Sequence, residues 1–266
     1  MISRRALLAL VVAVGVAGCA ALRERFPGPS VLFVATPSSV SLEMLKVAAV
    51  GPEDAVFDLG SGDGRVVIAA ARDFGARGVG IEIDPKLVNI SRDAALAAGV
   101  ASRVTFLWED LFASDLTGAT VVTLYLRDDV NLKLRPKLLR ELAPGTRVVS
   151  HDFDMGDWEP DRVQTVRSRE REHRLYFWLI PARTAGIWDS RVGAGEAATL
   201  TLTQEFQKLG GTLGGQPITG RLRGERVEIA AGALTLRGVA LGDRIEGEAS
   251  EAGGAMQRWS AHRAQN

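Results

Sequence analysis

Short apolar runs alternate with longer segments of helical periodicity through the middle of the chain. The runs, rich in β-branched residues, predict strands at 55–59, 78–83, 103–107, 119–126 and 147–150. Apolar residues at helical spacing predict intervening helices at 66–74, 85–98 and 131–142. Near-continuous apolar strands that alternate with helices are typical of a parallel sheet covered on both faces. We therefore expect an α/β fold with a doubly wound, mostly parallel sheet, whose last strand is the apolar run 175–181.

The pattern changes after residue 185. Fifteen of the 29 glycines lie in 185–266, and residues 199–203 alternate between threonine and leucine, so one strand face is buried and one is wet. Short strand-like runs occupy 198–206, 216–223, 226–231, 233–241, 243–249 and 257–263. Such runs, separated by glycines, are typical of an antiparallel meander or a small barrel, here with Trp188 and Trp259 in its core. We expect an α/β domain over 26–184 and a small all-β antiparallel domain over 185–266.

An uncharged stretch of small and apolar residues, 6–22, lies near the N-terminus between pairs of arginines. It ends in Val16-Ala17-Gly18-Cys19, which resembles the bacterial lipobox, a signal whose cysteine is lipidated. The alternatives are an uncleaved membrane anchor and a start codon assigned too early. All three leave residues 1–25 outside the globular fold. The first two predict a membrane-associated protein and leave the side of the membrane open.

Charge and cysteine content narrow the function classes. The 266 residues carry 32 basic and 32 acidic side chains, whereas a duplex nucleic-acid binder usually has a basic surplus, so no nucleic-acid partner is expected. Cys19 is the single cysteine. An internal disulfide and a cysteine-built zinc site are therefore excluded, as is thiol chemistry in a domain that begins after residue 25.

A glycine-rich turn follows the first predicted strand, with the sequence Asp58-Leu59-Gly60-Ser61-Gly62-Asp63-Gly64-Arg65. Glycines let the backbone approach a ligand closely, and the next helix directs its N–H groups into the same space. The G-x-G-x-G spacing differs from the G-x-G-x-x-G of dinucleotide binders, which makes NAD or another nucleotide the second choice of cofactor. The next two strands are also followed by acids, Glu82 and Asp110. Ligands bind outside the carboxyl ends of the strands in such sheets.

These residues resemble motif I and the acidic positions that follow it in class I S-adenosylmethionine-dependent methyltransferases. The resemblance implies a Rossmann-like fold, with S-adenosyl-L-methionine as cofactor. It implies that Asp58 and Gly60 hold the methionine end, while Glu82 accepts hydrogen bonds from the ribose hydroxyls and Asp110 from the adenine amino group. The neighbouring residues assigned to cofactor binding are Ser61, Gly62, Gly64 and Leu111. Each acid also has a structural interpretation: a strand-end cap for Asp58, a solvated loop acid for Glu82 and a helix N-cap for Asp110.

Residues 33–160 are similar to a narrower group, the protein-lysine methyltransferases of archaea, bacteria and mitochondria. The similarity rests on Ala35-Thr36-Pro37, the glycine-rich turn, Gly80-Ile81-Glu82 and Ser91-Arg92. It implies N-methylation of a lysine-type protein acceptor near a membrane, with membrane proteins among the acceptors. The candidate catalytic residues are Tyr125 and Asp128 after the fourth strand, which would orient an amine and help to remove its proton. A packed strand-end aromatic is the structural interpretation of Tyr125.

A non-enzymatic function is the alternative. A lipobox directs the chain outward, whereas S-adenosylmethionine is cytoplasmic, so the chain would be an envelope lipoprotein whose methyltransferase-like domain is a binding scaffold. The sequence leaves the acceptor and the oligomeric state open.

Histidines occur at two places near the expected acceptor side. His151-Asp152-Phe153-Asp154 follows the fifth strand. Alternation in an extended segment places His151 and Asp152 on opposite sides, so we expect no metal site and interpret the segment as a loop that lines the acceptor entrance. His173, which lies among arginines, is expected to be a solvated strand residue.

Overall fold

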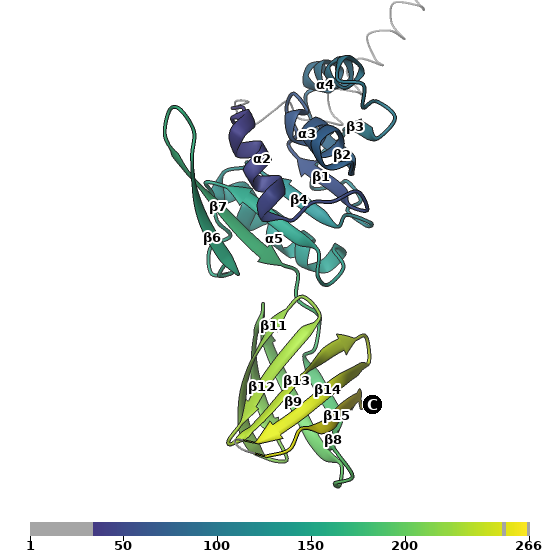
Figure 1. Ribbon diagram of the computed structural model, residues 1–266, viewed down its shortest axis with the longest axis vertical. Helices are drawn as coiled ribbons and strands as arrows, with labels where there is room; N and C mark the ends of the chain where they lie inside the picture. The colour runs from purple at the N-terminus through teal and green to yellow at the C-terminus, as the bar shows by residue number, and fades with distance from the viewer. Residues whose placement is uncertain (1–33, 252–253, 265–266) are drawn as a thin grey trace, which may run out of the picture.

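The computed structural model describes residues 34–251 and 254–264. A seven-stranded sheet with the order β3-β2-β1-β4-β5-β7-β6 forms the first part of the fold (Figure 1). Its strands are β1 (Ala55–Leu59), β2 (Arg77–Glu82), β3 (Val104–Trp108), β4 (Val121–Leu124), β5 (Arg147–His151), β6 (Arg162–Arg167) and β7 (Glu172–Leu179). The pairs among β1 to β5 are parallel, whereas β7 is antiparallel to both β5 and β6. The predicted α/β fold with a mostly parallel sheet is confirmed.

Strand β6 was not predicted, and its position explains why. It pairs with β7 and forms the edge of the sheet. An edge strand contacts solvent along one side, so its sequence lacks the continuous apolar run of the central strands, and Val163 is half-exposed.

Helices cover both faces of the sheet, because alternate residues of each central strand point to opposite faces. The helices are α2 (Ser38–Val47), α3 (Arg65–Phe74), α4 (Pro85–Ala97) and α5 (Asp128–Glu141). On one face α2 and α3 pack against Val121 and Val149, and on the other α5 packs against Val122 and Val148. Helix α4 packs beside α3, over Phe106. Among the described residues, no helix is long and apolar enough to cross a membrane. The predicted signal or anchor over 1–25, with Cys19, lies outside the described residues.

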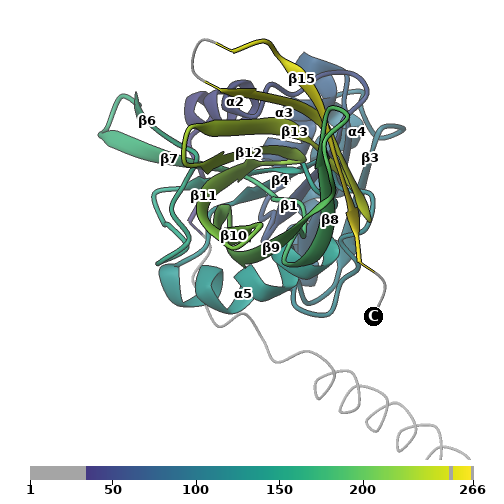
Figure 2. The ribbon, with the colours of Figure 1, turned by 90° about the horizontal axis from the view of Figure 1, so that it is seen from below.

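A closed antiparallel barrel of eight strands forms the C-terminal part (Figures 1 and 2). Its strands are β8 (Gly186–Val192), β9 (Ala198–Glu205), β10 (Lys208–Leu213), β11 (Gln216–Arg223), β12 (Arg226–Ala231), β13 (Leu234–Leu241), β14 (Arg244–Glu251) and β15 (Gln257–Arg263). Trp188 and Trp259 are fully buried in its core, as expected. The sequence did not predict β8 or β10. Two adjacent glycines, Gly210 and Gly211, hide β10, while β8 closes the barrel by pairing with β15 and β9.

The barrel is attached at the edge of the sheet where the parallel strands begin. Leu179, the last residue of β7, pairs with Arg147, the first residue of β5. Beyond this point the Ala182 N–H donates to the Gly224 carbonyl at 2.8 Å, and Phe206 stacks on Trp158 with ring centroids 5.9 Å apart. The predicted division after residue 184 falls between β7 and β8. The carboxyl ends of the parallel strands therefore lie at the opposite edge from the barrel.

Candidate active site

A cavity of about 800 Å³ lies at the carboxyl ends of the parallel strands. Its wall is built from the ends of β1, β2, β3 and β4, from the turns that follow them, and from the segment that precedes α2. The predicted site residues in this wall are Asp58, Gly60, Ser61, Glu82, Asp110, Leu111 and Tyr125. Gly62, Gly64 and Asp128 do not line the cavity.

The glycine-rich turn is held against β2. The N–H groups of Gly60 and Ser61 both donate to the Ile81 carbonyl, at 2.9 and 3.0 Å. Gly64 has φ of 77°, and a Cβ on it would lie 2.6 Å from the Phe106 ring. Glycine is thus required at 64 to pack the start of α3, whereas Gly60 borders the cavity directly.

Glu82 connects two turns of the cavity wall. Its Oε2 accepts from the Gly62 N–H and its Oε1 from the Asp84 N–H, both at 2.9 Å. The side chain is buried, so the interpretation of Glu82 as a solvated loop acid is wrong. A carboxylate oxygen has more than one lone pair, and these oxygens can also accept from a ligand in the cavity.

Asp58 is nearly buried, with 6% of its surface exposed. Its Oδ1 accepts from the Thr123 hydroxyl at 2.6 Å. Burial raises the pKa of Asp58 to about 7; the Thr123 hydrogen bond opposes the rise, and the charges of Glu82 and Asp63 add to it. A cation bound in the cavity would favour the charged form of this carboxyl.

Asp110 combines a structural position with access to the cavity. Its Oδ1 accepts from the Phe112 N–H at 2.9 Å, and its carbonyl accepts from the N–H groups of Ala113 and Ser114. The capping interpretation of Asp110 is therefore correct, and the same side chain borders the cavity.

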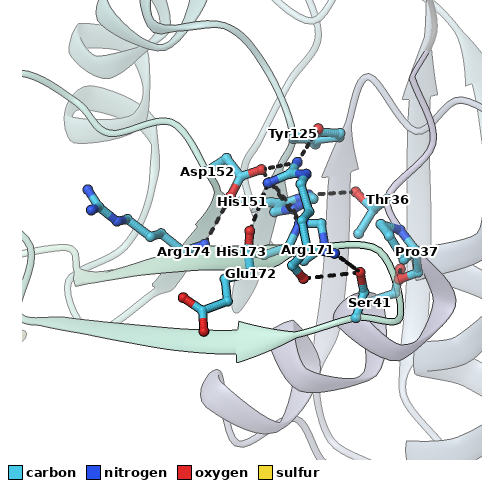
Figure 3. A network of polar contacts seen from close by, with 11 residues as sticks. Thr36, Pro37, Ser41, Tyr125, His151, Asp152, Arg171, Glu172, His173 and Arg174 are labelled. Carbon is cyan, nitrogen blue, oxygen red and sulfur yellow. Dashed lines mark hydrogen bonds and ion pairs between the residues drawn. The ribbon is translucent and has the colours of Figure 1, made fainter.

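The acceptor side of the cavity is built on a buried histidine (Figure 3). Tyr125 stacks on His151 with ring centroids 3.9 Å apart, and its hydroxyl lies 3.4 Å from Nη2 of Arg171. His151 Nδ1 lies 3.1 Å from the hydroxyl of Thr36, a residue of the cavity wall. His151 Nε2 lies 2.8 Å from Nδ1 of His173. Burial lowers the pKa of His151 to about 4, against the effect of Asp152 and with added repulsion from His173 and Arg171.

Two expectations for these histidines are wrong. His173 is 3% exposed and not solvated, because it pairs with His151 beneath the sheet edge. Asp152 does not point away from His151. Its φ of 61° breaks the extended alternation, so its Oδ2 lies 3.2 Å from His151 Nε2 and 3.6 Å from His173 Nδ1.

Comparison with known proteins decides what kind of site this is. The family model for the ANTKMT methyltransferase domain matches residues 58–162. A protein-lysine N-methyltransferase of Saccharolobus islandicus is 41% identical over 153 residues, which is 57% of this chain and 95% of the archaeal protein. The chain belongs to the family of S-adenosylmethionine-dependent methyltransferases that contains this enzyme.

Other relatives match this methyltransferase over shorter spans. The adenine nucleotide translocase lysine N-methyltransferase of Mus musculus is 39% identical over 40% of this chain, and the chain spans 46% of that protein. A lysine N-methyltransferase of Homo sapiens, named for a component of ATP synthase, is 40% identical over 40% of this chain, and the chain spans 45% of it. The chain thus spans about half the length of each of these two relatives.

A solved structure also matches this methyltransferase. It is described as an RNA methyltransferase from Salinibacter ruber in complex with S-adenosyl-L-homocysteine, and it is 56% identical with a TM-score of 0.54. The match covers 57% of this chain and 96% of the solved chain.

The cofactor of this methyltransferase is S-adenosyl-L-methionine, and the cavity fits it. The hydroxyl oxygen of Ser61 is buried in the wall and has no hydrogen-bond partner among the described residues, so a polar group is available for a ligand. Carboxylates at the ends of β1, β2 and β3 accept hydrogen bonds, which suits a ligand with amino and hydroxyl donors and positive charge. Bound S-adenosyl-L-methionine supplies an electrophilic methyl group on a sulfonium.

Of the two candidate catalytic residues in this methyltransferase, only Tyr125 lines the cavity. Asp128 is exposed at the first turn of α5, where an acid interacts favourably with the helix dipole. Sequence reasoning missed Thr36 and Arg65. The Arg65 Nη1 donates to the Thr36 carbonyl at 2.9 Å and the guanidinium pairs with Asp63, so it joins the glycine-rich turn to the segment before α2. Its place directly after the turn is the signal that marks it.

Proposed function

We propose that this methyltransferase transfers a methyl group to the side-chain amine of lysine in a protein. The charge of the cavity carries the proposal, because six carboxylates face one guanidinium, that of Arg65, in the wall that the described residues form. These acids are Asp58, Asp63, Glu82, Asp84, Glu109 and Asp110. A lysine ammonium group and a cationic cofactor are both attracted to such a wall, whereas the phosphates of RNA are repelled. The names of the curated relatives, which are lysine N-methyltransferases, support this substrate class.

For cofactor binding we propose separate roles for the three acids. Asp58 and the Gly60 backbone hold the methionine end, Glu82 accepts from the ribose hydroxyls, and Asp110 accepts from the adenine amino group. Ser61 and Leu111 complete the wall around the cofactor. Gly62 and Gly64 act at one remove, because Gly62 holds Glu82 in place and Gly64 packs the start of α3.

On the acceptor side we assign contact with the amine to Tyr125. Methyl transfer requires a neutral amine held in line with the methyl group, so orientation and loss of a proton are what the protein must provide. The stack on His151 and the contact with Arg171 fix the Tyr125 ring, and its side chain borders the cavity. Asp128 lies outside the cavity wall, and we propose no direct contact with the amine for it.

A radiolabel transfer assay tests the substrate class. The full chain is incubated with methyl-labelled S-adenosylmethionine and a lysate of cells that lack the gene, and label is measured separately in protein and in RNA. Label in protein, located on lysine by mass spectrometry and lost in Glu82→Gln, is the expected result. Glu228→Gln is the matched control, since Glu228 lies exposed on β12 and pairs with Arg237, far from the cavity wall.

An RNA acceptor is the second candidate, because the solved structure that is 56% identical is described as an RNA methyltransferase. Label in RNA alone would establish this candidate and overturn the lysine proposal. Label in neither fraction, with cofactor binding intact, would favour the scaffold function.

We also propose that residues 1–25 hold the enzyme at a membrane, so that the acceptor is a protein near or within it. The support is the uncharged stretch 6–22 and the lipobox-like sequence that ends at Cys19. Cell fractionation combined with a labelled lipid precursor is the test, with Cys19→Ser as the variant. Label lost in Cys19→Ser supports lipidation. An unlabelled membrane protein supports the anchor, and an unlabelled protein in the soluble fraction refutes both.

A further inference from the structure

Three side chains beside the acceptor side of the cavity direct donor atoms toward one point (Figure 3). They are His151 and Asp152 at the end of β5 and His173 on β7, and we refer to them as the His-Asp-His cluster. The Nε2 of His151 lies 2.8 Å from the Nδ1 of His173, and Oδ2 of Asp152 lies 3.2 and 3.6 Å from these two nitrogens. Two neutral imidazoles and one carboxylate thus share a small, mostly buried space.

The spacing of these atoms matches a tetrahedral metal ion. Ligands about 2.0–2.1 Å from a Zn²⁺ ion are separated from one another by roughly 3.3 Å, and the three distances here average about 3.2 Å. A point about 2.0 Å from all three atoms lies about 0.7 Å out of their plane, as at the face of a tetrahedron. We propose that the His-Asp-His cluster binds one divalent transition-metal ion of the Zn²⁺ type.

The outward nitrogens of both rings are held as they are in metal sites. A ligating histidine usually has its second ring nitrogen hydrogen-bonded, which fixes the tautomer and the ring orientation. Here the Thr36 hydroxyl lies 3.1 Å from His151 Nδ1, and the Ser168 hydroxyl lies 3.0 Å from His173 Nε2. The two nitrogens that face each other are therefore the ones available to a metal.

The donor set selects the class of ion. Imidazole nitrogen suits Zn²⁺, Co²⁺ and Ni²⁺, whereas Mg²⁺ and Ca²⁺ require mostly oxygen ligands. Three protein ligands leave one position of the tetrahedron for water or another small ligand.

Arg171 is the competing cation. Its Nη2 lies 2.5 Å from Oδ2 of Asp152, and the side chain is half-exposed, so it can leave toward solvent when an ion binds. Replacing Arg171 removes both a positive charge and a partner of the ligand oxygen. Metal affinity should therefore rise in Arg171→Gln, a result that adventitious binding to surface histidines does not produce.

The ion would connect three parts of the acceptor side. His151 and Asp152 lie at the end of β5, His173 lies on β7, and the hydrogen bond to Thr36 reaches the segment before α2. Tyr125 stacks on His151, so the ion would also stiffen the support of that ring. This inference goes beyond the proposed function, and it holds whichever acceptor the enzyme uses.

Metal titration of the full, untagged chain tests the site. After treatment with a chelator, the protein is titrated with Zn²⁺ by calorimetry and with Co²⁺ by visible absorption. We expect one equivalent of Co²⁺ with the intense bands of a tetrahedral site, and a Tm that rises with Zn²⁺. Wild-type protein that binds no stoichiometric ion would overturn the proposal, whatever its methyltransferase activity.

Variants localise the ion to the cluster. His151→Gln and His173→Gln should each lose stoichiometric binding, whereas His262→Gln should bind as wild type, because His262 is exposed on β15 of the barrel. An equal loss in His262→Gln would refute the assignment. Ser168→Ala keeps all three ligands and should weaken binding by about 10- to 100-fold. It provides a test in a folded protein should a histidine variant lose its native circular dichroism, and unchanged affinity in Ser168→Ala would then contradict the proposal.

Discussion

Asp58→Asn is expected to stabilise the cofactor-free enzyme at high pH while weakening cofactor binding. Asparagine is almost the same size as aspartate, and its Oδ1 can still accept from the Thr123 hydroxyl. What changes is the charge of a buried group whose pKa is raised from 3.8 to about 7. This difference corresponds to roughly 4 kcal/mol against the charged form in the folded state.

The sign of the effect follows from proton linkage. Between pH 4 and 7 the unfolded chain has released the Asp58 proton and the folded chain retains it, so this group's contribution to stability falls as pH rises. The loss is complete above about pH 7 and absent below about pH 4. Asp58→Asn should therefore raise the free energy of unfolding at pH 8 by about 2–4 kcal/mol and change it little at pH 4.

Asp54 provides a control of opposite sign, just before the other end of β1. Burial would raise its pKa, but hydrogen bonds from Thr120, Gly51 and Arg147 outweigh burial and lower it. Its contribution to stability is thus present at neutral pH and is lost as pH falls through its lowered pKa. Asp54→Asn should destabilise the enzyme at pH 8.

Urea denaturation at pH 4.5 and pH 8, with calorimetric titration of S-adenosylmethionine at pH 8, measures these effects. Cofactor affinity should fall at least about tenfold in Asp58→Asn, because a carboxylate that pairs with a cationic ligand is gone. The reasoning is refuted if Asp58→Asn destabilises the protein at pH 8, or if its stability change is the same at both pH values.

Three further predictions concern the cavity wall. Glu82→Gln should raise the Kd for S-adenosylmethionine by about 10- to 100-fold and lower stability by about 1–3 kcal/mol, because an amide group cannot accept from both turn N–H groups; a Kd equal to that of Glu228→Gln would contradict this. Tyr125→Phe should lower kcat and leave cofactor affinity within about twofold, measured by methyl transfer and calorimetry, since only the hydroxyl is removed; an unchanged kcat would leave Tyr125 a packing residue. Gly64→Ala should cost more than about 1 kcal/mol in urea denaturation, because its φ is 77° and the new Cβ would meet Phe106, and a variant as stable as wild type would disprove the clash.

The position of the barrel limits its part in these predictions. It joins the sheet where the parallel strands begin, whereas every residue of the cavity wall lies near the ends of those strands or in and beside the segment before α2. Variants in the barrel, such as Glu228→Gln, are therefore suitable controls for cofactor binding.

Local sequence was sufficient for the parallel sheet and for the cofactor side of the cavity. Each central strand is a continuous apolar run, and the acids Asp58, Glu82 and Asp110 lie next to the strands that position them. Because the carboxyl ends of parallel strands meet at one edge, their order along the chain predicted that they would gather. All three border the cavity.

Tertiary structure alone decided the acceptor side and the closed barrel. His151 and His173 are 22 residues apart and meet only because β7 pairs antiparallel with β5, a direction that no pattern along the chain encodes. The positive φ of Asp152 then turns a carboxylate toward both rings, against the alternation of an extended strand. Barrel closure likewise depends on the pairing of β8 with β15, far apart in the chain. Periodicity reports which side of an element is buried, whereas the partner that buries it is selected by the fold.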